Sequence, residues 1–128
     1  MLERLIAAGA PKPRGPYSHA VRAGDFVFVS GQGPIDPATN ELKIGDVGSE
    51  TRATLENIRS ILKAAGADLA DVVKCGVFLT DIRDFAAMNV VYSEFFGEIR
   101  PARTTVQAIL PAHGSKVEID CVAYKPLK

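Results

Sequence analysis

The sequence predicts an α+β domain in which two helices cover one face of a single mixed β-sheet. Two observations support this class: apolar residues recur at helical spacing in two central segments, and strand-like apolar runs lie before, between and after them. This order of elements builds one layer of helices on one sheet. We expect residues 1–128 to form one domain, because a chain of 128 residues with 47% apolar content suits a single core.

The first half of the chain is expected to contain a short strand, a long loop and a helix. The strand covers Asp25 to Ser30, and the loop covers Asp36 to Gly48, which is rich in turn residues. A helix begins near Ser49 and stops at Gly66. Its apolar stripe, which must face the sheet, consists of Leu55, Ile58, Leu62 and Ala65.

The second half is expected to contain a strand, a second helix and a terminal hairpin. The strand covers Asp71 to Thr80, and the helix starts near Asp81 to Asp84 and closes at Gly97. Phe85, Met88, Tyr92 and Phe95 recur along one face of that helix. Turn residues between Arg103–Leu110 and Lys116–Tyr124 predict that these two strands form a hairpin.

Arg103 is the first candidate for a functional residue, since it stands at the start of a strand just after Pro101. In the last strand Glu118 and Asp120 share one face, while small apolar residues take the other. The alternative from pattern alone is a solvated arginine and a surface glutamate, which is the commoner situation for both residue types.

Composition argues against several partners. Fifteen basic and fifteen acidic residues cancel, so the chain offers no net positive field for nucleic acid or for a membrane surface. No apolar run approaches the roughly 18 residues of a membrane span. The N-terminus, with Glu3 and Arg4 before a short apolar stretch, lacks the pattern of a secretory signal, so a cytoplasmic location is expected.

The cysteines and histidines do not suggest a metal or redox site. Cys75 and Cys121 lie in apolar strand-like runs without a Cys-x-x-Cys spacing, which predicts free buried thiols. His19 and His113 are far apart in sequence and lie in loop-like surroundings. A chemistry without metal or cofactor is therefore expected.

Four stretches, taken together in this order and spacing, resemble one known family over almost the whole chain. They are Gly15 to Val21, Val29 to Gln32, Asp84 to Phe96, and Pro101 to Thr105 leading to Val117-Glu118-Ile119. The chain is similar to the reactive-intermediate deaminases (RidA), also called the YjgF/YER057c/UK114 family.

This resemblance implies a chorismate-mutase-like subunit that associates as a homotrimer, with active sites in clefts between neighbours. It also implies hydrolysis of 2-imino acids and their enamine tautomers, such as 2-aminoacrylate, to 2-oxo acids and ammonia. Arg103 would bind the substrate carboxylate through two parallel hydrogen bonds, and Glu118 would position or activate water. No cofactor or covalent nucleophile is implied.

Four further residues match positions of the family's site: Tyr17, Ser30, Asn89 and Thr105. Their hydroxyl or amide groups would contact the substrate or its water. Tyr17 has the alternative role of capping the sheet, Ser30 that of ending a strand, and Asn89 that of a satisfied polar residue on the helix. Thr105 stands where many members have cysteine, so its side chain is not expected to be a nucleophile, although its backbone would still bind substrate or water.

Two departures from the family pattern leave alternatives open. The segment between Arg103 and Pro111 is one residue shorter than the common pattern, which predicts a bulge or shifted register near Arg103. The chain's end is also similar to that of 2-aminomuconate deaminases, whose substrate is a ring-cleavage enamine. The alternatives are an enzyme of that type and a non-catalytic, ligand-binding or chaperone-like trimer.

Overall fold

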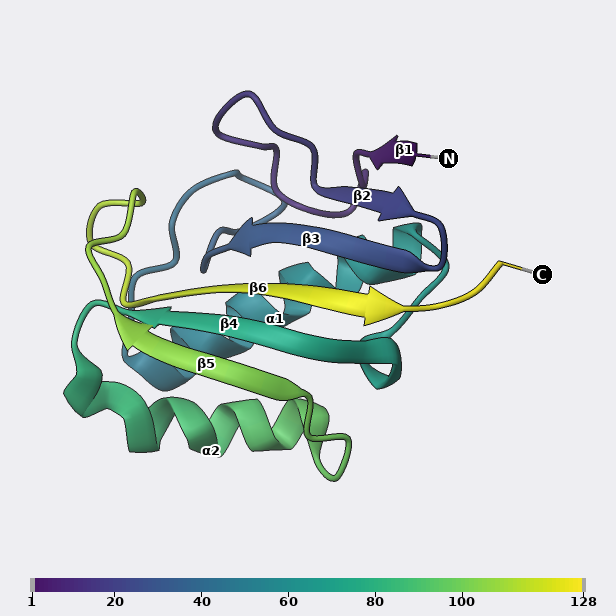
Figure 1. Ribbon diagram of the computed structural model, residues 1–128. Coiled ribbons are helices and arrows are strands. Elements are labelled where there is room, and N and C mark those ends of the chain that lie inside the picture. The colour runs from purple at the N-terminus through teal and green to yellow at the C-terminus, as the bar shows by residue number, and fades with distance from the viewer. Residues whose placement is uncertain (1, 128) are drawn as a thin grey trace.

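A computed structural model describes residues 2–127 (Figure 1). The chain forms, in order, β1 (Leu2–Leu5), β2 (Ala20–Ala23), β3 (Phe26–Gln32), α1 (Val47–Ala64), η1 (Leu69–Asp71), β4 (Val72–Leu79), η2 (Ile82–Asp84), α2 (Phe85–Phe96), β5 (Ala102–Gln107) and β6 (Val117–Tyr124). The elements η1 and η2 are single 3₁₀ turns.

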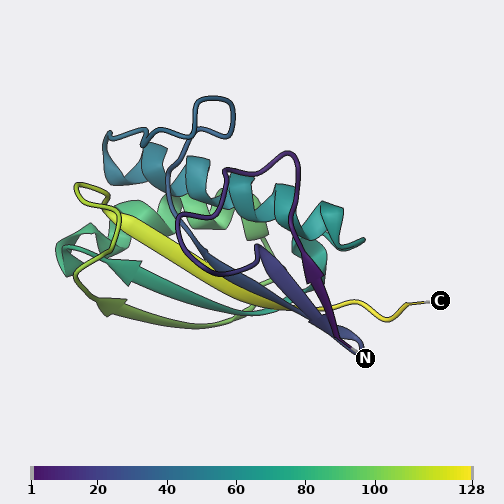
Figure 2. The same ribbon diagram turned by 90° about the horizontal axis from the view of Figure 1, so that it is seen from above.

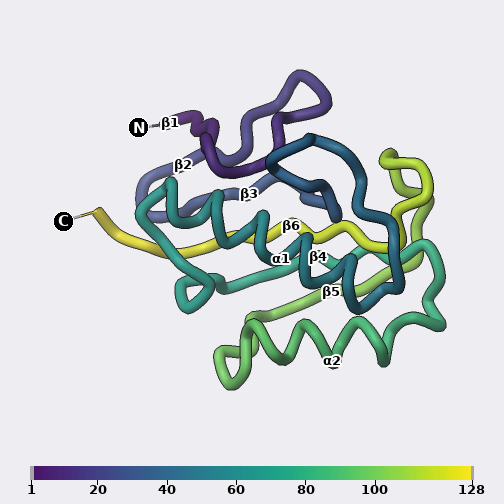
Figure 3. The backbone as a smooth tube through the Cα atoms, turned by 180° about the vertical axis from the view of Figure 1, so that it is seen from behind, coloured from purple at the N-terminus to yellow at the C-terminus, as the bar shows by residue number. Residues whose placement is uncertain are grey.

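The strands form one mixed sheet in the order β1-β2-β3-β6-β4-β5. Every neighbouring pair is antiparallel except β4 and β5, which run parallel. Both helices lie side by side on the same face of the sheet (Figures 2 and 3). The predicted fold class is confirmed.

Helix α1 follows the predicted apolar stripe and starts slightly earlier than expected. The Asp46 carboxylate caps its first turn by accepting a hydrogen bond from the Ser49 amide at 2.7 Å. Leu55, Ile58 and Leu62 are fully buried against the sheet. Gly66, with φ +82°, takes the left-handed conformation just after the helix. Within residues 2–127, neither helix is long and apolar enough to cross a membrane.

The predicted terminal hairpin is wrong. Strand β6 lies between β3 and β4, whereas β5 occupies the edge of the sheet beside β4. One side of β6 is entirely buried, which suits a central strand, while polar β5 suits an edge. Strand β5 also ends at Gln107, because the chain turns away into the loop before β6 instead of continuing to Leu110.

The expected bulge near Arg103 is also wrong. Strands β4 and β5 pair without interruption from Lys74↔Ala102 to Leu79↔Gln107. An irregularity occurs instead between Val29 and Gln32 of β3, where its pairing with β6 shifts. The shorter segment after Arg103 therefore changes the loop and leaves the strand register intact.

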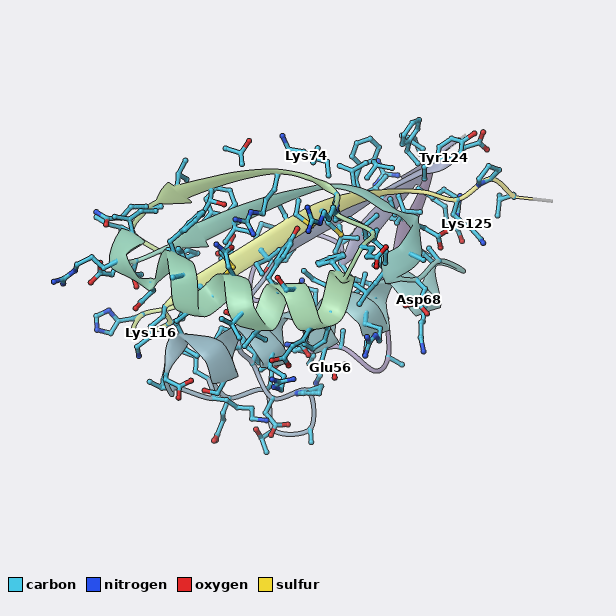
Figure 4. The ribbon with its side chains drawn as sticks, turned by 90° about the horizontal axis from the view of Figure 1, so that it is seen from below. Glu56, Asp68, Lys74, Lys116, Tyr124 and Lys125 are labelled. Atoms are coloured by element: carbon cyan, nitrogen blue, oxygen red, sulfur yellow. The ribbon has the colours of Figure 1, made fainter. Side chains whose placement is uncertain are left out.

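The two faces of the sheet differ in what covers them. The helix side holds the core, including the free thiols of Cys75 and Cys121, which are buried as predicted and face each other in the β4–β6 register. Lys74 and Tyr124 project from the opposite, open side (Figure 4). That side also exposes apolar side chains, namely Phe26, Phe28, Val73, Val106 and Tyr124. Apolar surface gathered on an uncovered face marks an interaction site.

Candidate functional site

Arg103 lies on the edge strand β5 with its side chain on the helix side of the sheet. Its register partner on β4 is Cys75, whose own partner on β6 is Cys121, and both thiols are buried in the core. Directly paired residues point to the same face of a sheet. Arg103 is the last residue in this row of paired residues, so its guanidinium lies at the edge of the sheet beside helix α2.

Aromatic rings of α2 hold the Arg103 guanidinium in place. Its Cζ lies 4.7 Å from the centroid of Tyr92 and 5.5 Å from that of Phe85. Stacking on ring faces is a favourable arrangement for a guanidinium and leaves its N–H groups free at the rim. Arg103 forms no ion pair or hydrogen bond with another side chain of residues 2–127. It is therefore a positioned cation that lacks an anion.

Asn89 and Thr105 accompany Arg103. Asn89 lies on α2 between Phe85 and Tyr92 at helical spacing, and its buried Oδ1 has no hydrogen-bond partner. Thr105 follows Arg103 by two residues on β5, so both side chains point to the same face. The alternative of a satisfied helix residue does not hold for Asn89 within one subunit. An unpaired buried acceptor of this kind calls for a donor from elsewhere.

Glu118 lies on the open side of the sheet, with Tyr17, Ser30 and Gly31 around it. These residues and Pro111 line a hollow of about 250 Å³. A Cβ at Gly31 would overlap the Glu118 carboxylate, so a larger residue where the irregular part of β3 passes β6 would displace this side chain. The half-buried carboxylate forms no ion pair within residues 2–127.

Tyr17 and Ser30 each form a hydrogen bond with a residue of the segment that precedes β2. The Tyr17 hydroxyl accepts a hydrogen bond from the Arg14 amide at 3.2 Å, and the Ser30 hydroxyl donates to the Ser18 carbonyl at 2.7 Å. Tyr17 remains about half exposed. Each hydroxyl keeps hydrogen-bonding capacity toward the hollow beside Glu118.

The electrostatic surroundings of Glu118 favour its protonated form. Partial burial raises the pKa of this carboxyl above its ordinary value, and the negative charge of Asp120 adds to the effect. Asp120 lies two residues along β6 on the same face and accepts a hydrogen bond from the Gly76 amide at 3.0 Å. A carboxylate with a raised pKa is better suited to accepting and returning a proton near neutral pH.

Arg103 and Glu118 do not meet within one subunit. Register pairs on β4 place Glu118 opposite Phe78 and level with Val106, on the open side, whereas Arg103 is level with Cys75 on the helix side. The structure thus brings together Arg103, Asn89 and Thr105 in one place, and Glu118, Tyr17 and Ser30 in another. The two groups are separate clusters on opposite faces of the sheet, and we call them candidate half-sites.

The ring of His19 is engaged with backbone groups. His19 is buried, with Nδ1 accepting a hydrogen bond from the Ala7 amide at 2.8 Å and Nε2 lying 2.6 Å from the Pro11 carbonyl. Among residues 2–127, no three His, Cys, Asp or Glu side chains gather in a way that would hold a metal ion.

The sequence pattern did not identify the residues that position the candidate side chains of Arg103 and Glu118. Phe85 and Tyr92 were predicted to share one face of α2 without a further role, whereas their rings contact the Arg103 guanidinium and Phe85 remains 42% exposed. Gly31 belongs to a motif but carries no side chain that would point to chemistry. Asp120 was already placed on the same face as Glu118 by the alternation along this strand, but its effect on Glu118 was not predicted.

Known proteins similar to this chain span nearly its full length. Residues 7–125 match the family model described as Endoribonuclease L-PSP. A RutC family protein of Pyrococcus horikoshii is 50% identical over 98% of this chain and 99% of its own. The goat 2-iminobutanoate/2-iminopropanoate deaminase is 44% identical over 96% of this chain and 90% of its own. The crystal structure of RidA from an Antarctic Psychrobacter superposes with a TM-score of 0.91 at 42% identity, covering 95% and 98% of the two chains.

Proposed function

Because the chain belongs to the Endoribonuclease L-PSP family, which includes proteins named RutC, RidA and imine deaminase, we propose that it hydrolyses 2-imino acids and their enamine tautomers to 2-oxo acids and ammonia. The substrates are of the 2-iminopropanoate or 2-aminoacrylate type. The observation that carries the proposal is Arg103, a stacked guanidinium at the sheet edge with no anion of its own.

Arg103 binds the substrate carboxylate. Two parallel charge-assisted hydrogen bonds from its fork fix both the position and the plane of the carboxylate, which a lysine would not do. Asn89, whose Oδ1 lacks a donor, accepts a hydrogen bond from the substrate or its water. The adjacent Thr105 backbone and side chain complete this half-site.

Glu118 positions the water and moves its proton. As the water oxygen bonds to C2, the C=N π electrons move to nitrogen, and the Glu118 carboxylate accepts the proton that the water loses. Glu118 returns this proton to nitrogen, which gives the neutral carbinolamine. Glu118 then transfers the proton of the carbinolamine hydroxyl to the amino nitrogen, and the C=O bond forms as the C–N bond breaks and ammonia leaves the 2-oxo acid. An imine is reactive enough for positioning and one acid–base group to suffice. Tyr17 and Ser30 hold the water and the substrate against Glu118.

A complete site requires two copies of the chain. Arg103 and Glu118 lie on opposite faces of one sheet, so no movement of side chains joins them within a subunit. Apolar side chains on the open face, among them Phe28 and Val106, supply a surface for self-association. We propose a homotrimer in which the open faces pack together and each cleft combines the Arg103 half-site of one subunit with the Glu118 half-site of the next.

RNA cleavage, which the family model's name suggests, has less support in this chain. The net charge is zero, and both ring nitrogens of His19 are already engaged with backbone groups. Affinity for RNA depends on cationic surface that neutralises phosphates. The imine reaction, by contrast, uses Arg103 and Glu118, neither of which forms an ion pair within residues 2–127.

The proposal is tested by trapping imino acids as they form. An amino-acid oxidase generates a series of 2-imino acids in the presence of semicarbazide, and the protein competes with the trap by hydrolysing the imine. Wild type is expected to lower semicarbazone formation, Glu118→Gln is expected to lower it far less, and Glu3→Gln on exposed β1 serves as the control. Semicarbazone yields that wild type leaves unchanged for every side chain tested would contradict the proposal.

The pH profile provides a second prediction. Since Glu118 must be ionised to accept a proton, kcat/KM falls as the pH drops through its raised pKa, above the usual glutamate value of about 4.3. Asp120→Asn removes the neighbouring charge and lowers that pKa, so the acidic limb is expected to move to lower pH. The asparagine Oδ1 still accepts the hydrogen bond from Gly76. An acidic limb at the same pH in both proteins would mean that another group titrates.

A further inference from the structure

A cation that the proposed reaction leaves unused lies beside Glu118. Arg14 lines a second hollow, of about 230 Å³, together with small and apolar side chains. This hollow shares Tyr17, Gly31, Pro111 and Glu118 with the first one. A molecule whose reacting carbon lies against Glu118 can therefore extend along the shared wall toward Arg14.

Arg14 is held in place and keeps most of its donors. Its Nη2 donates to the Asn40 carbonyl at 2.7 Å, and its backbone amide donates to the Tyr17 hydroxyl. An arginine fork carries five N–H donors, so several remain for a ligand. Within residues 2–127, Arg14 forms no ion pair with a carboxylate.

The remainder of the wall is neutral. Gly33, Ile35, Ala112 and Val117 contribute no charge, and the Ser115 hydroxyl already donates to the Ala112 carbonyl at 2.8 Å. Arg14 and Glu118 are thus the two charged side chains that line the hollow. Because the Glu118 carboxylate repels anions, a negatively charged end of the ligand is favoured on the Arg14 side.

We propose that Arg14 binds a second carboxylate, so that the preferred substrates are 2-imino acids with a carboxylate at the far end of a short chain. This inference rests on the proposed function, in which Arg103 of a neighbouring subunit binds the carboxylate next to the imine. The substrate is then a dianion held by one arginine at each end, with the C=N carbon against Glu118. Arg14 acts as a residue that determines specificity.

The test compares two stable products that share a five-carbon chain. Calorimetry measures the binding of 2-oxoglutarate, which has the second carboxylate, and of 2-oxopentanoate, which lacks it. Wild type is expected to bind 2-oxoglutarate about tenfold more tightly or better, as a charge-assisted bidentate contact allows. In Arg14→Leu this ratio is expected to approach one. Lys12→Ala is the matched control, since Lys12 contacts Asn40 through its backbone amide and not its side chain.

Each outcome separates the inference from the function on which it rests. Equal affinities in wild type, or a ratio that Arg14→Leu leaves unchanged, would overturn the inference. If Arg14→Leu lowers the melting temperature and leaves the affinity ratio unchanged, Arg14 only stabilises the loop that contains Asn40, and the inference fails. The trapping assay with imines of glutamate and norvaline tests the proposed function separately. Hydrolysis of both imines without preference would overturn only the inference about Arg14. Arg14-dependent binding without hydrolysis of either imine would overturn only the proposed function.

Discussion

Replacing Arg103 by alanine is expected to lower kcat/KM for 2-imino acids by about 100-fold or more. Hydrogen bonds to charged groups each contribute about 1.5–3 kcal/mol, and the guanidinium supplies two to the substrate carboxylate. Arg103→Lys is expected to regain little of this loss, because an ammonium lacks the fork and stacks less well on Tyr92 and Phe85. Trapping kinetics over a range of imine concentrations measure both variants.

A matched control for Arg103 exists on the outer side of the helices. Arg59 also stacks on an aromatic ring, with its Cζ 5.2 Å from the Phe95 centroid, but it lies away from both half-sites. Arg59→Ala is therefore expected to retain wild-type kinetics. Equal losses in Arg59→Ala and Arg103→Ala would assign the effect to folding or assembly and would contradict a role in binding substrate.

Mixing two inactive variants tests whether sites are shared between subunits. In oligomers assembled from equal amounts of Arg103→Ala and Glu118→Gln chains, a cleft that draws one residue from each neighbour is intact in about a quarter of cases. Co-expression is thus expected to restore about a quarter of the wild-type activity. A site contained in one chain would give no restoration, which would overturn the proposed assembly.

Glu50→Ala is expected to cause the largest loss of stability, about 2–4 kcal/mol in the free energy of unfolding, because two backbone amides lose a buried acceptor and each such loss costs about 1–3 kcal/mol. Glu50 lies fully buried in the first turn of α1. One carboxylate oxygen accepts a hydrogen bond from the Lys116 amide at 2.6 Å. The other accepts from the Gly45 amide at 3.1 Å and from the Lys116 ammonium at 3.4 Å.

The reason for this large effect is that Glu50 joins two loops, by accepting hydrogen bonds from Gly45 in one loop and from Lys116 at the end of the other. Alanine would leave the amides of Gly45 and Lys116 without an acceptor beneath the wall that contains Ser115 and Glu118. Urea unfolding at a fixed protein concentration measures the change. Glu56→Ala, on the exposed side of the same helix, is expected to cost less than about 0.5 kcal/mol. Similar losses in both variants would contradict the role of Glu50.

The sequence predicted those features that depend on neighbours along the chain. The stripe containing Leu55 and Ile58 follows the helical repeat, so the chain alone located α1 to within about two residues of its start. The alternation around Glu118 likewise identified a strand with two faces. By contrast, β1 and β2 are short, and three of the four residues of β1 are exposed, so their apolar pattern was too weak to predict.

The tertiary structure alone decided how the strands pair and therefore where the candidate residues lie. Local pattern predicted a hairpin of β5 and β6, because residues near in sequence favour short connections. The buried side of β6 favours two neighbours, so β6 inserted between β3 and β4 and left β5 at the edge. This strand order separates Arg103 from Glu118, and it places Arg103 at the sheet edge, where its guanidinium contacts the rings of Phe85 and Tyr92. The sequence by itself thus determined the family, the helices and the candidate residues, whereas strand order, which depends on burial across the sheet, determined that these residues lie in two groups on opposite faces.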